Sequence, residues 1–263
     1  MSSRRTFVQK ALTVVATCGL LPGFLPGDMQ IVAKKTEGWT GEQDDLQKIN
    51  ELITGKAPIK WIFAGDSITQ GAKHTSGSRS YPEIFAERIR WEMGRVRDVV
   101  INTAISGNTS KDIVSDFEWR IAQFKPTIVS VMIGTNDASE KKSITKEAFR
   151  QNNLELINRI RGLGAIPILQ TPNIIITERA TGRERIQDYI VISRQIAADN
   201  QVILVDHFAF WSEKVQTGSR ERIFTKWLND ELHPNAAGHV QMAHLLFRKL
   251  SLFDPNAFTC RES

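Results

Sequence analysis

Residues 60–71 read Lys60-Trp61-Ile62-Phe63-Ala64-Gly65-Asp66-Ser67-Ile68-Thr69-Gln70-Gly71. An apolar run that meets one glycine and breaks at a second predicts a short buried strand followed by a turn. A serine at the end of such a strand can turn its side chain out of the sheet, next to backbone N–H groups that the following segment leaves unpaired. Ser67 is therefore a candidate nucleophile. A nucleophilic serine needs a base, a group that orients the base, and donors for an oxyanion.

Ser67 by itself does not establish an active site, because a serine after a strand is commonly a helix cap. The stretch is also not the Gly-x-Ser-x-Gly elbow of the α/β-hydrolases, since Thr69 stands at the second glycine position. The case for a nucleophile therefore depends on the rest of the chain.

Strand and helix patterns alternate along that remainder. Strands are predicted at residues 59–64, 98–102, 127–133, 166–170 and 202–205. Helices are predicted at residues 45–54, 81–93, 110–123, 145–162, 186–199 and 235–250, with short helical pieces within 207–228. This alternation predicts an α/β fold with a central parallel sheet of about five strands and helices on both faces.

A candidate base lies in the stretch Asp230-Glu231-Leu232-His233-Pro234. In a tight turn, Asp230 can accept the Nδ1–H of His233, three residues later. The alternative is a surface turn that caps the helix starting near Asn235, with His233 solvated.

Two turns after neighbouring strands offer oxyanion donors. Gly107 follows the second strand, where the absence of a side chain lets a backbone N–H approach a ligand. Asn136, in Gly134-Thr135-Asn136-Asp137, follows the third strand and can donate through its amide. Each stretch is also compatible with an ordinary turn. Because the carboxyl ends of parallel strands share one edge, Ser67, Gly107 and Asn136 are expected to lie together there.

These four stretches resemble the signature blocks of the SGNH, or GDSL-type, hydrolases, and they occur in the family's order. The resemblance implies a three-layer α/β/α sandwich of flavodoxin type. It implies that Ser67 is the nucleophile, that His233 is the general base and acid, and that Asp230 orients His233. It assigns the oxyanion hole to the N–H groups of Ser67 and Gly107 and the Asn136 side chain. No metal ion and no organic cofactor is expected.

The first 33 residues have the pattern of an export signal. Arg4-Arg5-Thr6-Phe7 precedes an apolar run, residues 11–21, that is too short to span a bilayer as a helix. The paired arginines resemble a twin-arginine leader, so a periplasmic or extracellular location is expected. Lipid attachment at Cys18 is the alternative that we do not favour. Residues 34–55 are interpreted as a linker or N-terminal extension, and residues 56–255 as the hydrolase domain.

The composition is that of an ordinary globular protein. The chain has 263 residues, of which 41% are hydrophobic, and a formal net charge of +5. This is enough apolar material for a core without disulfides, and the charge gives no reason to expect nucleic-acid binding. Cys260 is expected to be exposed, unpaired and without a zinc role.

Several other polar and aromatic residues are interpreted as structural or solvated. Asp206 and His207 are adjacent in a strand and point to opposite faces. Histidines 239 and 244 are five residues apart in a helix, which does not place them on one face for a metal. Packing is the favoured role for Trp211 and Trp227. Solvated loop positions are expected for His74, Arg79, Arg179, Arg183 and Arg185.

The sequence therefore predicts an exported serine esterase whose substrate is a small-molecule or polysaccharide ester, with no membrane span. Removal of O-acetyl groups from a carbohydrate is the preferred interpretation. It rests on the export signal, the lack of a long apolar segment for a lipid lid, and the tryptophans near the histidine stretch. A lysophospholipase, thioesterase or lipase on the same triad remains an alternative, as does a non-catalytic carbohydrate-binding protein. The acyl group, the alcohol and the oligomeric state stay open.

Overall fold

A computed structural model describes residues 41–261 of the chain. Five parallel strands form one sheet in the order β2-β1-β3-β4-β5. The strands are β1 (Lys60–Gly65), β2 (Val99–Asn102), β3 (Ile128–Met132), β4 (Ile166–Thr171) and β5 (Ile203–Asp206). This is the strand order of flavodoxin-like folds, so the predicted fold class is confirmed. The predicted leader and Cys18 lie outside the described residues.

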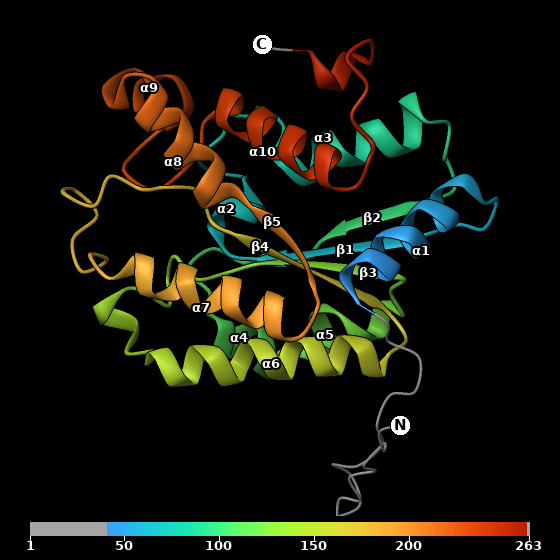
Figure 1. Cartoon of the computed structure of the whole chain (residues 1–263), viewed down its shortest axis with the longest axis horizontal. Helices are drawn as coiled ribbons and strands as arrows, with labels where there is room; N and C mark the ends of the chain where they lie inside the picture. The colour runs from blue at the N-terminus through green and yellow to red at the C-terminus, as the bar shows by residue number, and fades with distance from the viewer. Residues whose placement is uncertain (1–40, 262–263) are drawn as a thin grey trace, which may run out of the picture. The chain divides into compact units, whose positions relative to one another are not determined.

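Helices cover both faces of the sheet, and each face has its own cluster of buried side chains. The first face carries α1 (Glu42–Thr54), α3 (Tyr81–Glu87), α8 (His207–Thr217), α9 (Arg220–Trp227) and α10 (Ala236–Lys249). The second carries α4 (Ser110–Ser115), α5 (Phe117–Arg120), α6 (Lys146–Gly162) and α7 (Ile186–Asp199). Figure 1 shows α3 and α10 on one side of the sheet and α6 and α7 on the other.

The remaining elements are short. Among the described residues they are α2 (Ser67–Gln70), a π-helical turn (Arg88–Glu92) and three 3₁₀ turns (Ala122–Phe124, Glu140–Lys142 and Phe258–Cys260). Within residues 41–261, no helix combines the length and the apolar character needed to cross a membrane.

Capping side chains set the starts of two helices. Ser80 and Glu83 form a capping box before α3, in which the Ser80 N–H donates to the Glu83 carboxylate at 2.7 Å. Asn235 caps α10 by accepting the N–H of Gly238 through Oδ1 at 3.0 Å. These oxygens satisfy N–H groups that a helix leaves unpaired in its first turn, so both helices begin where the sequence predicts.

The helix predicted over residues 110–123 is interrupted at Asp116, whose φ and ψ of −97° and 15° end α4. After the break, Arg120 in α5 turns toward the strand ends and is fully buried. Its guanidinium donates to Thr103 O at 3.0 Å, Asn108 Oδ1 at 2.6 Å and Gly65 O at 3.0 Å. A buried charge persists only where its donors are paired. The break therefore positions an inward-pointing arginine that the apolar pattern does not reveal.

The helix predicted at residues 45–54 is present as α1, in the stretch interpreted as a linker or N-terminal extension, whereas the expectation that Cys260 is exposed is wrong. This helix buries Ile49 and Ile53 in the core cluster shared with α3 and α10, so the compact unit begins before residue 56. Cys260 is only 4% exposed. Its thiol packs as a small apolar group against the first face, where residues after α10 fold back.

Steric crowding explains why glycine occupies positions 65 and 71, on either side of α2. A Cβ on Gly65 would lie 2.6 Å from the Met132 carbonyl oxygen of β3 and would overlap Thr69 in α2. Gly71 ends α2 with φ of 72°, and a Cβ there would overlap Ser80. These close approaches hold α2 against the end of β3 and turn the chain sharply after it.

Gly65→Ala should lower the free energy of unfolding by about 1–3 kcal/mol, because the added methyl group overpacks a closed site. Gly162→Ala is the matched control, since no atom lies within 4 Å of its Cβ position. Alanine is the better helix former, so this variant should keep or gain stability by up to about 1 kcal/mol. Urea unfolding followed by circular dichroism measures both. Equal stabilities for the two variants would contradict the steric explanation.

Candidate active site

Ser67 is the first residue of α2 and directly follows β1. Asp66 caps this short helix, and its Oδ1 accepts the N–H of Ile68 at 3.0 Å. On the other side, Asn102 Nδ2 donates to Thr69 O at 2.8 Å. With its backbone held in this way, Ser67 places its Oγ 2.9 Å from His233 Nε2. The structure therefore brings the predicted nucleophile into hydrogen-bond contact with the predicted base.

The stretch 229–234 is the tight turn that this role requires. Oδ1 of Asp230 accepts the backbone N–H groups of Leu232 and His233, both at 2.8 Å. The Asn229 N–H donates to the carbonyl of His233 at 2.8 Å and closes the turn. His233 Nδ1 then lies 2.9 and 2.8 Å from the two carboxylate oxygens of Asp230. The His233 side chain is 12% exposed, so the alternative of a solvated histidine does not hold.

These contacts assign the proton positions. Because an ionised carboxylate only accepts, Nδ1 of His233 carries the proton, and Nε2 is left to accept from the Ser67 hydroxyl. Burial alone would raise the pKa of Asp230, but the N–H groups of Leu232 and His233 hold it below its usual value. Burial lowers the pKa of His233, although Asp230 opposes this effect. His233 is therefore unprotonated at neutral pH and can accept a proton.

The Asn136 amide joins the other two predicted segments to this centre. One of its Nδ2 hydrogens donates to Asn108 O at 3.0 Å. The other makes only a marginal contact of 3.5 Å with Asp66 Oδ2, which leaves it available to an incoming oxygen. Gly107 stands beside Asn108 with φ of 80°, a conformation that suits glycine. The turns after β1, β2 and β3 thus meet at one edge of the sheet, as expected for parallel strands.

Arg183 orients the Asn136 amide, a role that the sequence analysis missed. It was expected to be solvated. Its Nε donates to the carbonyl of Thr135 at 3.1 Å, and its Nη2 donates to Asn136 Oδ1 at 3.3 Å. A guanidinium on the amide oxygen fixes which way the amide faces and turns Nδ2 toward Asn108. No local pattern in the chain distinguishes Arg183 from its exposed neighbours Arg179 and Arg185.

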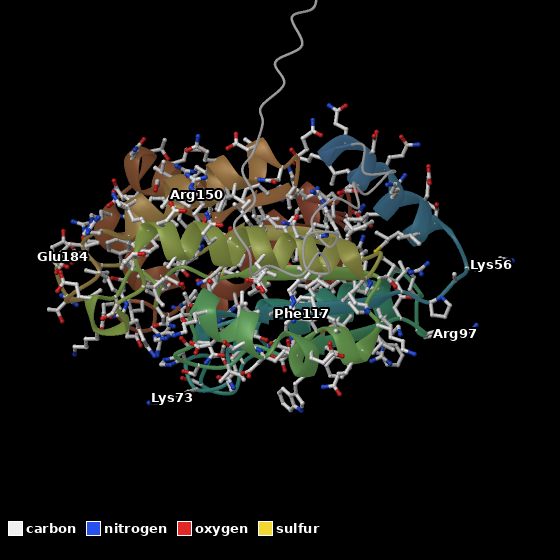
Figure 2. The ribbon with its side chains drawn as sticks, turned by 90° about the horizontal axis from the view of Figure 1, so that it is seen from below. Lys56, Lys73, Arg97, Phe117, Arg150 and Glu184 are labelled. Carbon is white, nitrogen blue, oxygen red and sulfur yellow. The ribbon has the colours of Figure 1, made fainter. Side chains whose placement is uncertain are left out.

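The loop 173–185 that carries Arg183 is also bonded to the His233 turn. Ile176 N–H donates to Glu231 O at 2.8 Å, and Asn173 Nδ2 donates to Leu232 O at 3.1 Å. One loop therefore holds both the amide donor and the turn that carries the base. Lys73 and Glu184 belong to the loops beside the site. In Figure 2 they lie toward the left of the view, whereas Lys56 and Arg97 lie at the right.

His74 also belongs to the site, although the sequence favoured a solvated position. Its ring is stacked on that of His233, with centroids 3.4 Å apart and planes 4° apart. Its Nδ1 lies 3.3 Å from Asp230 Oδ2. The loop after Gly71 thus returns a second imidazole to the Asp230 carboxylate.

Two buried carboxyl groups lie behind the site. Burial raises the pKa of Asp66 to about 7, against the effect of the Ile68 N–H. Burial also raises the pKa of Asp137 to about 6, although Ser110 donates to it through its N–H at 2.9 Å and its hydroxyl at 2.5 Å. Asp66 is therefore partly protonated at neutral pH, which reduces the negative charge beside the Asn136 amide.

The other polar candidates are structural, as the sequence predicted. Three of the five histidines are bonded in the interior: His207 to Gln170, His239 to Tyr81 and His244 to Thr259. Burial lowers the pKa of both His207 and His239 to about 3, so these rings are neutral. Arg79 and Arg185 are exposed and pair with Glu87 and Asp188.

The tryptophans near the histidine turn are buried against each other. Trp211 and Trp227 are 0% and 6% exposed, and their ring centroids lie 4.9 Å apart in an edge arrangement. Neither ring offers a free face to a sugar. The favoured packing role is correct, and the tryptophans give no support for a carbohydrate substrate.

Metal binding at this site is disfavoured by geometry. His74, Asp230 and His233 offer ligand atoms within 4.8 Å of one another. Imidazole lone pairs lie in the ring plane, and these two rings are parallel. Their lone pairs do not converge on one ion in this arrangement.

An open cavity of about 710 Å³ lies beside the turn, with Asp230 in its wall. Its other walls include Arg220 and Phe224 of α9 and Glu178 of the 173–185 loop. Arg220 Nη2 and the Glu178 carboxylate join across it at 2.7 Å. A cavity of this volume and mixed polarity is within the range that holds small organic ligands.

The sequence profile of the GDSL-like lipase/acylhydrolase family matches residues 63–241. An acetylxylan esterase of Geobacillus stearothermophilus is 28% identical over 208 residues, which are 73% of this chain and 93% of that protein. An uncharacterized protein of Mycoplasma pneumoniae is 33% identical over 137 residues, half of this chain and 15% of that protein. The match thus covers most of the acetylxylan esterase but only a small part of the Mycoplasma pneumoniae protein.

Solved structures show the same fold. A variant of Axe2, an acetyl xylan esterase from Geobacillus stearothermophilus, aligns with a TM-score of 0.64 and 25% identity over 75% of this chain and 98% of that one. LAE5, an alpha/beta hydrolase enzyme from the metagenome of Lake Arreo, Spain, aligns with a TM-score of 0.64 and 23% identity. That alignment covers 74% of this chain and 96% of that one.

Arg183→Met should lower kcat for ester hydrolysis about tenfold with little change in KM, because the Asn136 amide loses the partner that orients it toward developing charge. Arg185→Met is the control from the same loop, since Arg185 is exposed and pairs with Asp188. It should stay within about twofold of the parent, as expected for a surface pair. Steady-state kinetics on p-nitrophenyl acetate separates kcat from KM. Similar losses in both variants would show that the loop's overall charge, not the amide contact, is responsible.

Proposed function

The chain belongs to the GDSL-like lipase/acylhydrolase (SGNH) family of carboxylic ester hydrolases, and from that premise we propose that it removes O-acetyl groups from a carbohydrate. The observation that carries the hydrolytic part is the bonded series from Asp230 through His233 to Ser67. The likeness to an acetylxylan esterase over 93% of that enzyme's length supports the acetyl group and the sugar.

In this proposal the reaction has two steps through an acetyl-enzyme. Ser67 Oγ attacks the acetyl carbonyl carbon while His233 Nε2 takes the hydroxyl proton. The bond between the acetyl carbon and the sugar oxygen then breaks, and His233 returns the proton to that oxygen, so the sugar leaves as an alcohol. Water next attacks the acetyl group on Ser67, with His233 as base again, and acetate is released. Asp230 stabilises the imidazolium in each step without taking its proton.

We assign three N–H donors to the negative charge that develops on the acetyl oxygen. They are the backbone N–H of Ser67, the backbone N–H of Gly107 and the second Nδ2 hydrogen of Asn136. The Asn136 donor is oriented before substrate arrives, because Arg183 holds the amide oxygen and Asn108 O holds the first hydrogen. Preoriented donors need no reorganisation during the reaction, and the loss of one costs roughly 10²–10³ in rate. No metal is required for these steps.

Purified protein should hydrolyse p-nitrophenyl acetate at least about tenfold faster than p-nitrophenyl octanoate, because a site for acetyl groups discriminates against a long acyl chain. It should also release acetate from acetylated xylo-oligosaccharides. Ser67→Ala is the matched control and should lower kcat by roughly 10⁴-fold or more. Release of p-nitrophenol and of acetate measures both activities. A preference for octanoate would favour the lysophospholipase, thioesterase or lipase alternative. If Ser67→Ala keeps the activity of the parent, or is still labelled by a fluorophosphonate probe, Ser67 is not the nucleophile.

We also propose that the enzyme acts outside the cytoplasm. The support is the sequence of the first residues, in which Arg4-Arg5 precedes the apolar run 11–21. A receptor-read twin-arginine signal tolerates loss of the arginine pair poorly, although lysine keeps the charge. The full chain with both arginines changed to lysine should therefore stay in the cytoplasmic fraction of a bacterial host, while the parent chain should appear in the periplasm or medium. Equal export of the two chains would contradict the proposal.

A further inference from the structure

The loop that follows the nucleophile helix returns a side chain to the catalytic histidine. Gly71 ends α2 in the left-handed region with φ of 72°. The N–H of Thr75 donates to Gly71 O at 3.2 Å, and the Thr75 side chain is only 4% exposed. This closed turn fixes the chain on either side of His74. The position of His74 is therefore set by the fold and not by a free loop.

The His74 ring covers one face of His233 and reaches the same carboxylate. The two rings are parallel, with centroids 3.4 Å apart. Nδ1 of His74 lies 3.3 Å from Asp230 Oδ2, the oxygen that is 2.8 Å from His233 Nδ1. One carboxylate oxygen is thus shared by two imidazoles. A stacked ring restricts rotation of its neighbour and keeps water from that face.

We propose that His74 is a positioning residue of this esterase, which holds the His233 ring against Asp230 and keeps His233 unprotonated and ready to accept the Ser67 proton. The role rests on the proposed hydrolytic function. His74 acts through His233 and Asp230 and takes no part in bond making.

The charges around His233 predict in which direction its pKa changes when His74 is removed. Burial is the largest cause that lowers the pKa of His233, Asp230 raises it, and His74 adds to the lowering. His74 also shares the carboxylate oxygen of Asp230 that would stabilise a protonated His233. Removal of His74 should therefore make His233 easier to protonate and move the acid limb of kcat/KM to higher pH.

The other ionisable groups around the pair do not replace His74. Asp230 and Glu231 lie on the same turn as His233 and both favour its protonated form. His239 of α10 interacts electrostatically with both His233 and His74, but burial lowers its pKa to about 3 and it stays neutral. The Tyr81 N–H, which donates to His239 Nδ1 at 3.2 Å, holds that ring in place. Among the described side chains that act on His233, His74 is thus the one whose charge interaction lowers the pKa of His233.

Two substitutions separate the stacking of His74 on His233 from its effect on the protonation of His233. His74→Phe keeps an aromatic ring over His233 and removes the ring nitrogen that lies beside Asp230. His74→Gln removes the ring and keeps a polar group near Asp230. Lys73→Ala is the matched control, since Lys73 is exposed in the same loop and is labelled at the surface in Figure 2. NMR of ¹⁵N-labelled imidazoles follows the protonation of His233 with pH in each variant. The pH profile of kcat/KM on p-nitrophenyl acetate follows its consequence.

The midpoint for protonation of His233 should rise by roughly half a pH unit or more in His74→Phe, with a matching rise of the acid limb of kcat/KM. In His74→Gln, kcat should fall at least about threefold at the plateau with KM unchanged, because the base is less well oriented. Lys73→Ala should match the parent in both measurements. Unshifted signals of His207 and His244, which are bonded to Gln170 and Thr259, report an intact fold.

A midpoint for His233 that is the same in the parent, His74→Phe and His74→Gln would overturn the proposal. So would a plateau kcat for His74→Gln equal to that of the parent. The titration does not depend on turnover. A shifted midpoint in a protein without Ser67-dependent hydrolysis would therefore support the placement of His74 and reject the proposed function separately.

Discussion

The site depends on the arrangement of strands around β1. The chain leaves β1 and forms β2 on one side, then returns to form β3 on the other side. Connections that depart in opposite directions leave a crevice at the carboxyl ends of the strands, which is where ligands bind in open parallel sheets. Ser67 lies directly at that point. The close approach of Gly65 to the β3 carbonyl brings the ends of β1 and β3 together, and the Asn136 amide after β3 lies 3.5 Å from the carboxylate of Asp66, which precedes Ser67.

One buried and one half-buried arginine hold the turns around this crevice. Arg120 ties the ends of β1 and β2 to Asn108, and Arg183 ties the β3 turn to a loop from beyond β4. Each guanidinium presents several fixed donors, so one side chain can bind oxygens from segments that are distant in sequence. The cost of desolvating these charges is offset by their hydrogen bonds. The result is a set of short turns held in fixed geometry, although turns are usually the mobile parts of a fold.

Much of this arrangement follows from local sequence. The five strands lie within about one residue of their predicted ranges, because each is a short apolar run bounded by turn residues. Ser67, Asp230 and His233 meet as predicted, since strand ends share one edge and an Asp three residues before a His can close a turn on it. The helices capped by Ser80 and Asn235 also begin within one residue of their predicted starts, because a cap bonds within its own turn.

The features that the sequence did not reveal are contacts between residues far apart in the chain. His74 and Arg183 were expected to be solvated, and Cys260 to be exposed, because nothing in the flanking residues distinguishes a loop side chain that faces water from one that faces the core. Composition, periodicity and four short motifs predicted the parallel sheet, the edge on which the candidate site lies and the contacts that join Ser67, His233 and Asp230. Only the tertiary structure decided that Trp211 and Trp227 are closed to a sugar, that Arg183 orients Asn136, and that His74 lies on His233. The physical reason is that strand and turn formation are set by neighbours in sequence, whereas the partner of a buried charge or ring is set by how distant segments pack.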